Sequence, residues 1–204
     1  MKIQRKFFFD SVRSSLFSGS MTQKQVDGMS GLLDRAEQTG VDDRHLAYIL
    51  ATTFHETAQT MQPIAEYGKG QGKKYGVPAG PYNQVYYGRG FVQLTWYDNY
   101  VAMQKALGSR WGGRDIVKVA DRAMDLDIAT DVIFYGMYYG SFTGVGMPKY
   151  ITVSNVETDT TDFYNARKVV NGLDQASTIQ GYAQKFANAL THSQKGEKGV
   201  SQAV

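Results

Sequence analysis

Residues 66–90, EYGKGQGKKYGVPAGPYNQVYYGRG, constrain the fold more than any other part of the chain. Seven of these 25 residues are glycine and two are proline, so the segment cannot form a helix. A long loop or a small twisted hairpin is expected there instead. Loops of this length inside a compact domain are uncommon and usually functional. The rest of the chain must therefore supply a scaffold that holds a Gly-rich lobe.

That scaffold is expected to be helical, because apolar residues recur at spacings of three and four. Leu46, Leu50 and Phe54 show the pattern most clearly. Helices are predicted over residues 3–17, 23–38, 43–61, 96–107, 126–141, 160–170 and 175–191. The sequence thus predicts a mainly α fold with one non-helical insertion.

Local signals mark the ends of these helices. Thr22 is predicted to cap the second helix, and Asp42 or Asp43 the third. Pro63 is expected to end or bend the third helix. The segment 126–141 is apolar nearly all round, which predicts a buried central helix.

No repeat or linker divides the chain, so a single domain is expected over residues 1–192. It would comprise N-terminal helices over 1–40 and a core over 41–192. Residues 193–204 are polar and rich in Gly and Lys, and they are predicted to form a frayed tail.

Composition excludes several classes of function. The 204 residues include no cysteine, which excludes thiol catalysis, zinc fingers, iron–sulfur clusters and disulfides. The net charge of +3 suits contact with an anionic polymer such as a cell wall and falls short of a nucleic-acid footprint. The apolar run Phe7–Phe9 is too short for a secretory signal, so cytoplasmic synthesis without a Sec signal is expected. No membrane span is expected either.

Three motifs for metals or phosphates fail on inspection. His55-Glu56 begins like a zinc-binding HExxH, but Gln59 stands where the second histidine is needed. Residues 68–74 lack the spacing and the Ser/Thr of a phosphate-binding loop, and residues 125–131 lack the central glycine of a calcium loop. No metal or organic cofactor is therefore expected.

The surviving candidates are two carboxylates, Glu56 and Glu66, which stand on either side of Pro63. A break at the proline would let the chain turn back and bring the second carboxylate across from the first. Glycoside hydrolysis needs such a pair, one protonated as acid and one ionised as base. The alternative is that Glu56, away from the apolar stripe of its helix, is a solvated surface residue.

The aromatic residues of the Gly-rich segment also allow two interpretations. They could pack the small lobe, or their rings could stack on the CH faces of sugars. The tyrosines concerned are Tyr67, Tyr75, Tyr82, Tyr86 and Tyr87.

Several motifs together resemble the catalytic domain of glycoside hydrolase family 19. They are FHETA (54–58) with the following Glu66, YYGRGFVQLTWYDNY (86–100) and ARKVVNGLD (166–174). That family comprises plant-type chitinases and the endolysins of phages and prophages. The N-terminal segment is similar to the compact phage lysins. The resemblance implies a lysozyme-like bilobal domain with a small Gly/Tyr-rich loop or β-hairpin lobe.

The resemblance also implies roles for individual residues. Glu56 matches the general acid, Glu66 the general base, and Thr95 the residue that helps to hold the attacking water of an inverting reaction. The substrate-binding matches are Tyr87, Arg89, Gln93, Asn99 and Asn171. For Arg89, support of the loop is weighed against substrate binding. Leu173 departs from the family, which has a second glycine there.

On this basis the expected function is endolysin-type cleavage of β-1,4 bonds between N-acetylated amino sugars of peptidoglycan. The expected partners are peptidoglycan glycan strands or chitin, without nucleic acid, and the protein is expected to be a monomer. A lysin made in the cytoplasm would need a holin or an injection device to reach the wall. The alternatives are a chitinase, a lytic transglycosylase and a non-catalytic sugar-binding protein.

Overall fold

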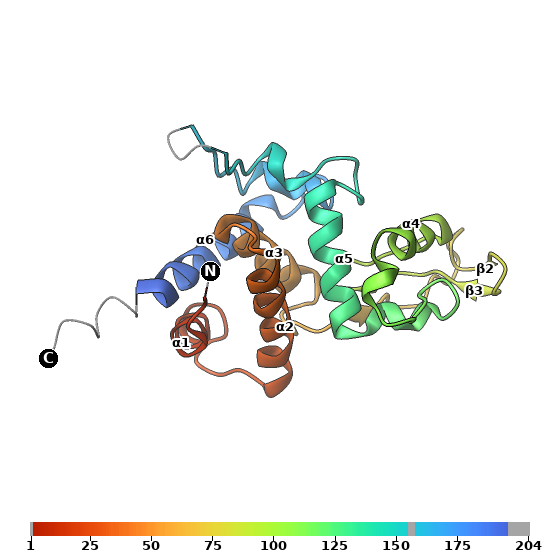
Figure 1. Ribbon diagram of the computed structural model, residues 1–204, viewed down its shortest axis with the longest axis horizontal. Helices are drawn as coiled ribbons and strands as arrows, with labels where there is room; N and C mark the ends of the chain where they lie inside the picture. The colour runs from red at the N-terminus through yellow and green to blue at the C-terminus, as the bar shows by residue number, and fades with distance from the viewer. Residues whose placement is uncertain (1, 155–157, 196–204) are drawn as a thin grey trace, which may run out of the picture.

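The structure is a computed structural model that describes residues 2–154 and 158–195. It has two lobes, separated in Figure 1 by the helix α5 (Leu126–Tyr139). The helical lobe contains α1 (Arg5–Ser15), α2 (Gln23–Thr39), α3 (Asp43–Glu56) and α6 (Ala176–Lys195). The small lobe extends from residue 64 to residue 124 and carries the Gly-rich segment. The fold is mainly α, as the sequence predicts.

Capping residues set the starts of the helices that carry the site. Thr22 forms a capping box with Gln25 at the start of α2, which confirms the predicted cap. At the start of α3 the cap is Asp42, whose carboxylate accepts from the Arg44 backbone N–H at 2.9 Å. Gly40 ends α2 in the left-handed conformation that glycine adopts without strain.

The helical lobe is built around α3, which is buried without interruption from His45 to Phe54. The predicted stripe of Leu46, Leu50 and Phe54 lies inside this core, each at most 1% exposed. Phe54 packs edge-on against Phe186 of α6, with ring centroids 6.0 Å apart. Packing on several sides therefore fixes the helix whose last residue is Glu56.

The second central helix, α5, contributes to both hydrophobic cores. Ala129 and Ile133 pack in the core of the helical lobe, whereas Ile128 and Val132 pack in the core of the small lobe. This double burial explains why the sequence of α5 is apolar nearly all round. The prediction of a buried central helix over 126–141 is confirmed, with an end at Tyr139.

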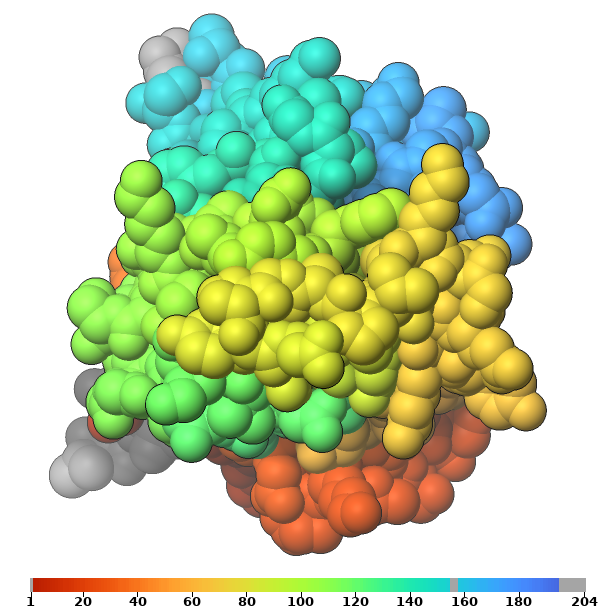
Figure 2. Space-filling view, turned by 90° about the vertical axis from the view of Figure 1, so that its right-hand side faces the viewer, coloured from red at the N-terminus to blue at the C-terminus, as the bar shows by residue number. Residues whose placement is uncertain are grey.

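The small lobe contains two short antiparallel ladders. The strand β1 (Ile64–Ala65) pairs with β4 (Arg89–Gly90), and β2 (Pro78–Ala79) pairs with β3 (Gln84–Val85). Its helices are α4 (Tyr97–Leu107) and the 3-10 helices η1 (Gly108–Arg110) and η2 (Ala120–Met124). Figure 2 shows the Gly-rich segment, in yellow, on the outer surface of this lobe. The hairpin alternative of the sequence prediction is therefore correct.

Three predicted helix boundaries are wrong. The third helix ends at Glu56 rather than at residue 61. The helix expected over 160–170 is only the 3-10 helix η4 (Asn165–Val169). Another 3-10 helix, η3 (Met147–Lys149), lies earlier in the chain. The last helix, α6, continues to Lys195, past the predicted start of the polar tail. The rest of that tail, 196–204, lies outside the described residues.

Of the helices in the described parts of the chain, none is long and apolar enough to cross a membrane.

Candidate active site

Glu56 is the last residue of α3, and its side chain is paired with Arg167 of η4. The guanidinium Nη1 lies 2.5 Å from Glu56 Oε1. The side chain of Arg167 is 3% exposed and that of Glu56 is 21% exposed. Glu56 is therefore not the freely solvated surface residue of the alternative interpretation. It is a partly buried carboxylate held by a buried cation.

The turn after Glu56 explains why the helix prediction to residue 61 fails. Ala58, Gln59 and Met61 all have positive φ, a conformation that ends an α-helix. Thr57 stabilises the turn, because its hydroxyl donates to the Thr53 carbonyl at 2.7 Å and accepts from the Met61 N–H at 3.1 Å. The chain reverses before Pro63 rather than at it. This reversal directs the chain into β1 and on to Glu66.

Glu66 follows β1, and both of its carboxylate oxygens are held. Oε1 accepts from the Tyr75 hydroxyl at 2.8 Å, and Oε2 accepts from the Gly88 N–H at 3.1 Å. The backbone N–H of Glu66 donates to the Gly88 carbonyl at 2.7 Å, which continues the β1–β4 ladder. The hydrogen bond to Glu66 raises the pKa of Tyr75 above its ordinary value, so this hydroxyl stays protonated as a donor.

The segment from Gln93 to Asn99 lies against the same strands. Gln93, at φ 53°, donates from its amide to the Ile64 carbonyl at 3.2 Å. The Asn99 amide donates to the Thr95 carbonyl at 2.8 Å, and the Thr95 hydroxyl donates to the Gln93 carbonyl at 3.3 Å. These bonds fix the backbone that presents the Thr95 hydroxyl.

Trp96 adds an exposed aromatic ring beside the candidate base. Its side chain is 47% exposed, and its ring lies edge-on to Tyr75 with centroids 5.2 Å apart. Trp96 has φ 71°, a conformation that costs a bulky residue energy. Sequence reasoning did not single out Trp96, although it belongs to the motif 86–100.

Arg89 lies inside the small lobe, 4% exposed. Its guanidinium donates to the Val85 and Tyr87 carbonyls at 3.0 and 3.2 Å and pairs with Asp121 at 2.8 Å. It also stacks 3.5 Å from the Tyr87 ring centroid. Because these partners use its donors, the structure favours the supporting role for Arg89 over substrate binding.

Asn171 is bonded to the backbone of Arg167, the partner of the candidate acid. Its N–H donates to the Arg167 carbonyl at 3.0 Å, and its side-chain oxygen accepts from the Gly172 N–H at 2.8 Å. Arg167 itself is a functional candidate that sequence reasoning missed. Arg167 belongs to the ARKVVNGLD motif, so the motif could have drawn attention to it. Its pairing with Glu56 was not predictable, because the two residues are 111 positions apart in sequence.

These contacts form two groups on two lobes. The acid group comprises Glu56, Arg167 and Asn171 of the helical lobe. The base group of the small lobe comprises Glu66, Tyr75, Gly88, Gln93, Thr95, Trp96 and Asn99. The turn at 57–63 joins the two groups.

The tyrosines of the Gly-rich segment divide between the two interpretations. Tyr86 and Tyr87 are buried, at 1% and 9% exposure, and pack the small lobe. Tyr67 is fully exposed and Tyr82 is 44% exposed, so their rings are accessible to a ligand. In the described ranges no group of three or more His, Asp or Glu side chains is placed to hold a metal ion.

Comparison with known proteins shows what this arrangement is similar to. No family model and no curated protein matches the sequence. Several solved structures match the fold, and two of them are compared here. The chitinase C of Streptomyces griseus HUT6037 aligns with a TM-score of 0.58 and 21% identity, over 94% of this chain and 76% of that one. A bacterial family 19 chitinase aligns with a TM-score of 0.57 and 20% identity, over 92% and 94% of the two chains.

The chain has the fold of family 19 chitinases. This likeness covers both lobes and agrees with the lysozyme-like bilobal domain expected from the sequence motifs. At this level of identity it establishes the fold alone, so the activity must be argued from the side chains.

Proposed function

We propose that the protein is an inverting glycoside hydrolase of the endolysin type, which cleaves β-1,4 bonds between N-acetylated amino sugars of peptidoglycan. One observation carries the proposal. Two carboxylates, Glu56 and Glu66, are each held by protein donors, one on each lobe of a family 19 chitinase fold. An acid and a base on opposite sides of a glycan are what hydrolysis with inversion requires.

Glu56 is assigned the role of general acid. Arg167 occupies Oε1, so Oε2 is the oxygen that carries the proton to the leaving group. Once the proton is transferred, the carboxylate is charged, and the 2.5 Å contact with the guanidinium stabilises that charge. Arg167 is a positioning residue in this scheme.

Glu66 is assigned the role of general base. The donors Tyr75 and Gly88 orient its carboxylate, and each oxygen keeps a lone pair free to accept from a water molecule. The Thr95 hydroxyl donates to a backbone carbonyl, which leaves its own lone pairs for the same water. The water loses a proton to Glu66 as it attacks the anomeric carbon on the face opposite the leaving oxygen.

Peptidoglycan is preferred to chitin as the substrate for two reasons. The chain has a net charge of +3, which favours an anionic wall polymer over a neutral one. The motifs and the short spacing between Glu56 and Glu66 are similar to those of compact phage lysins. A chitinase is the second candidate, and it is favoured because the structural neighbours are chitinases.

Digestion of purified peptidoglycan beside colloidal chitin tests the proposal. Mass spectrometry of the soluble products should show muropeptides with ordinary reducing ends, and NMR should show the inverted anomer first. Glu56→Gln and Glu66→Gln should each lower the rate by two or more orders of magnitude, as expected for a lost acid or base. Asp27→Asn, which changes an exposed carboxylate of α2, is the matched control and should leave the rate unchanged.

The other outcomes identify the alternatives. Products from chitin alone would make the protein a chitinase. Anhydromuramyl products that survive Glu66→Gln would make it a lytic transglycosylase. Binding to the wall without any product would make it a sugar-binding protein.

A further inference from the structure

A groove lies outside the candidate active site, between the two lobes. Its cavity of about 550 Å³ is lined by the end of α2, the first half of α3, the end of α4 and the outer face of α5. A neighbouring cavity of about 480 Å³ shares Tyr138 and Tyr139 with it. Sites for small ligands have volumes in this range. The two adjoining cavities are together called the α5 groove here.

The α5 groove lies across α5 from the candidate base. Asp131, Tyr135 and Tyr138 line it and fall within about 60° of one another on the helix. Ala129 lies about 160° away on the same helix. A methyl group at Gly90 of β4 would lie 3.8 Å from the Ala129 side chain, so Ala129 faces the β1–β4 ladder that leads to Glu66. A ligand in the groove would therefore not occupy the active site.

Among the described residues, the charge left unpaired in the groove is positive. Its two carboxylates, Asp131 and Asp42, are paired with Arg35 and Arg44 respectively. Arg110 lines the groove and is exposed, and it makes no ion pair or side-chain hydrogen bond with any described residue. Arg35 and Arg110 line the same cavity. Burial, and then the nearby charge of Arg110, lower the pKa of Arg35.

In the neighbouring cavity, Lys149 is a second cation that makes no ion pair with any described residue. It is exposed, lines the neighbouring cavity and stands 5.6 Å from the Tyr150 ring centroid. Arg110 and Lys149 thus place positive charge in both parts of the groove. An occupant with carboxylates distributed along its length would match them.

Exposed aromatic rings line both cavities. Tyr139 is 66% exposed and Tyr138 is 40% exposed, although both belong to the otherwise buried helix α5. Tyr139 packs against Tyr135 and Tyr138, with ring centroids 4.7 and 5.0 Å apart. Exposed rings held by neighbouring rings offer rigid stacking surfaces at little cost in conformational entropy.

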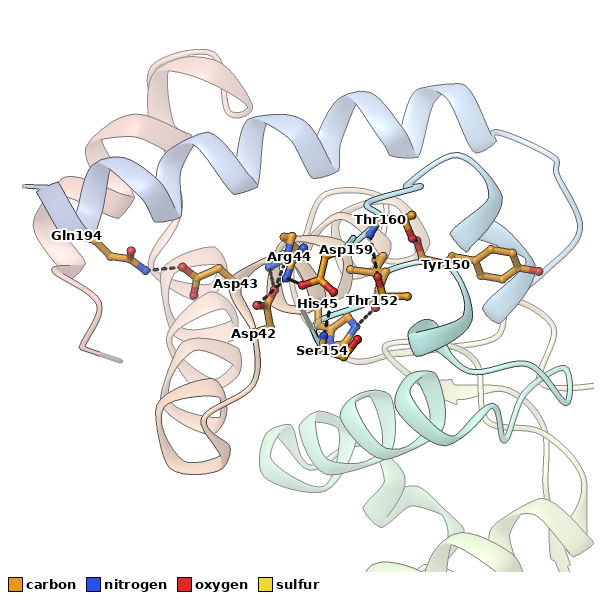
Figure 3. Close-up of polar contacts among 11 residues, drawn as sticks. Asp42, Asp43, Arg44, His45, Tyr150, Thr152, Ser154, Asp159, Thr160 and Gln194 are labelled. Atoms are coloured by element: carbon orange, nitrogen blue, oxygen red, sulfur yellow. Dashed lines mark hydrogen bonds and ion pairs between the residues drawn. The ribbon is translucent and has the colours of Figure 1, made fainter. Parts of the chain in front are cut away.

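A polar cluster fixes the rim of the groove (Figure 3). Arg44, at the start of α3, pairs with Asp159 at 3.1 Å, which ties the segment that begins at residue 158 to the helix. His45 bonds to the Ile151 carbonyl at 2.8 Å and packs edge-on against Tyr138, with centroids 5.8 Å apart. The groove is therefore held in shape before any ligand arrives.

We propose that the α5 groove is a second binding site for an anionic glycan strand, with sugar rings on Tyr138 and Tyr139 and carboxylates near Arg110 and Lys149. The inference rests on the proposed function, because peptidoglycan is the substrate class that combines sugar rings with carboxylates along one polymer. The groove would hold the enzyme on the wall while a separate stretch of glycan is cleaved.

Co-sedimentation with purified peptidoglycan sacculi tests this site. The inactive Glu56→Gln protein is used so that the polymer is not consumed. Adding Arg110→Gln and Tyr139→Ala should raise the dissociation constant at least tenfold. Adding Phe7→Ala and Lys118→Gln, an exposed ring and cation outside the groove, is the matched control and should change it less than twofold. Arg110→Gln alone should not weaken binding to neutral chitin.

A second measurement separates binding from damage to the fold. Arg110→Gln/Tyr139→Ala in the active protein should cleave a short soluble N-acetylated oligosaccharide at a rate within twofold of the parent. Unchanged sedimentation of the groove variant would overturn the proposal, as would an equal loss of oligosaccharide cleavage. If the parent releases no reducing ends from sacculi, the proposed function fails, but sedimentation still decides whether the groove binds the wall.

Discussion

Tyr75 is the residue on which the geometry of the candidate base depends most. Its hydroxyl holds one oxygen of Glu66, and its ring is held in turn by Trp96. The Gly88 N–H holds the other oxygen, but that bond belongs to the backbone and no side-chain substitution removes it. Tyr75 is therefore the side chain through which the orientation of Glu66 can be tested.

Tyr75→Phe should lower kcat about tenfold and change KM little. The phenyl ring keeps the contact with Trp96, and only the bond from the hydroxyl to the carboxylate is lost. A hydrogen bond to a charged group contributes about 1.5–3 kcal/mol, and a tenfold rate change corresponds to about 1.4 kcal/mol. The lower value applies because Tyr75 is only partly buried. Initial rates on soluble glycan fragments measure the effect.

Tyr82→Phe is the control, because Tyr82 is an exposed tyrosine of the same segment with no bond to Glu66. Its rate should equal that of the parent. Equal rates for Tyr75→Phe and the parent would show that Gly88 alone orients the carboxylate.

For single residues, the sequence predicted which side chains are candidates for the site, but it did not predict the partners that hold them. The motifs singled out Glu56 and Glu66 as candidates, but the pairing of Glu56 with Arg167 joins positions 111 residues apart. Nothing in the local pattern distinguishes a buried partner from an exposed arginine. The partners of Arg89 were not predictable either. Its guanidinium donates to backbone carbonyls that only the turn of the folded lobe brings within reach.

Among the elements, α2 and the turn at 57–63 pack with their backbones very close together. A Cβ added to Gly28 would lie 1.7 Å from the Met61 carbonyl oxygen, so only glycine allows the turn to cross the helix there. The Gln25 amide fastens the same crossing by donating to the Gln59 carbonyl at 3.0 Å. Because this turn directs the chain from Glu56 to Glu66, the packing of α2 positions the candidate base.

Gly28→Ala should destabilise the protein by about 3 kcal/mol, since the added methyl forces the turn away from α2. Gly31→Ala, one turn further along the same helix, is the matched control. A Cβ there would meet Leu126 at 3.5 Å, an ordinary contact, so the better helix former should stabilise the protein by up to about 1 kcal/mol. Urea unfolding followed by circular dichroism measures both. A Gly28→Ala protein as stable as the parent would contradict the close approach.

Helix positions were largely predictable because caps and apolar spacing are local signals. Thr22 and Asp42 fix two starts through bonds within their own turns. The end of α3 was not predictable in the same way. Its pattern continues past Glu56, but the positive φ values of Ala58, Gln59 and Met61 are imposed by packing against α2.

For the whole molecule, α5 is the element that couples the lobes. Its buried residue Asp131 accepts from the Trp111 indole N–H of the small lobe at 2.9 Å and pairs with Arg35 of α2. The side chain is 3% exposed, so removal of either lobe would leave a buried charge without one of its partners. Sequence patterns predicted a central helix here, but they could not show that one carboxylate joins two hydrophobic cores.

The two lobes should therefore unfold together. Trp111 is 1% exposed in the core of the small lobe, whereas the other tryptophan, Trp96, is 47% exposed. Trp96→Phe leaves Trp111 as the only indole, so its fluorescence reports on the small lobe. Circular dichroism at the helix band reports mainly on the helical lobe. Ile128 and Val132 of α5 pack in the core of the small lobe, and Ile133 packs in the core of the helical lobe. Because α5 belongs to both cores, the fluorescence and the circular dichroism should change at the same urea concentration.

Asp131→Asn tests the coupling directly. It removes the carboxylate charge that contacts both Arg35 and Trp111, and it keeps the side-chain volume. Both transitions should move together to lower urea. A fluorescence transition that precedes the circular dichroism transition in the Trp96→Phe protein would show that the small lobe opens independently. The base group, which lies in that lobe, would then be lost before the acid group, and activity would disappear with the first transition.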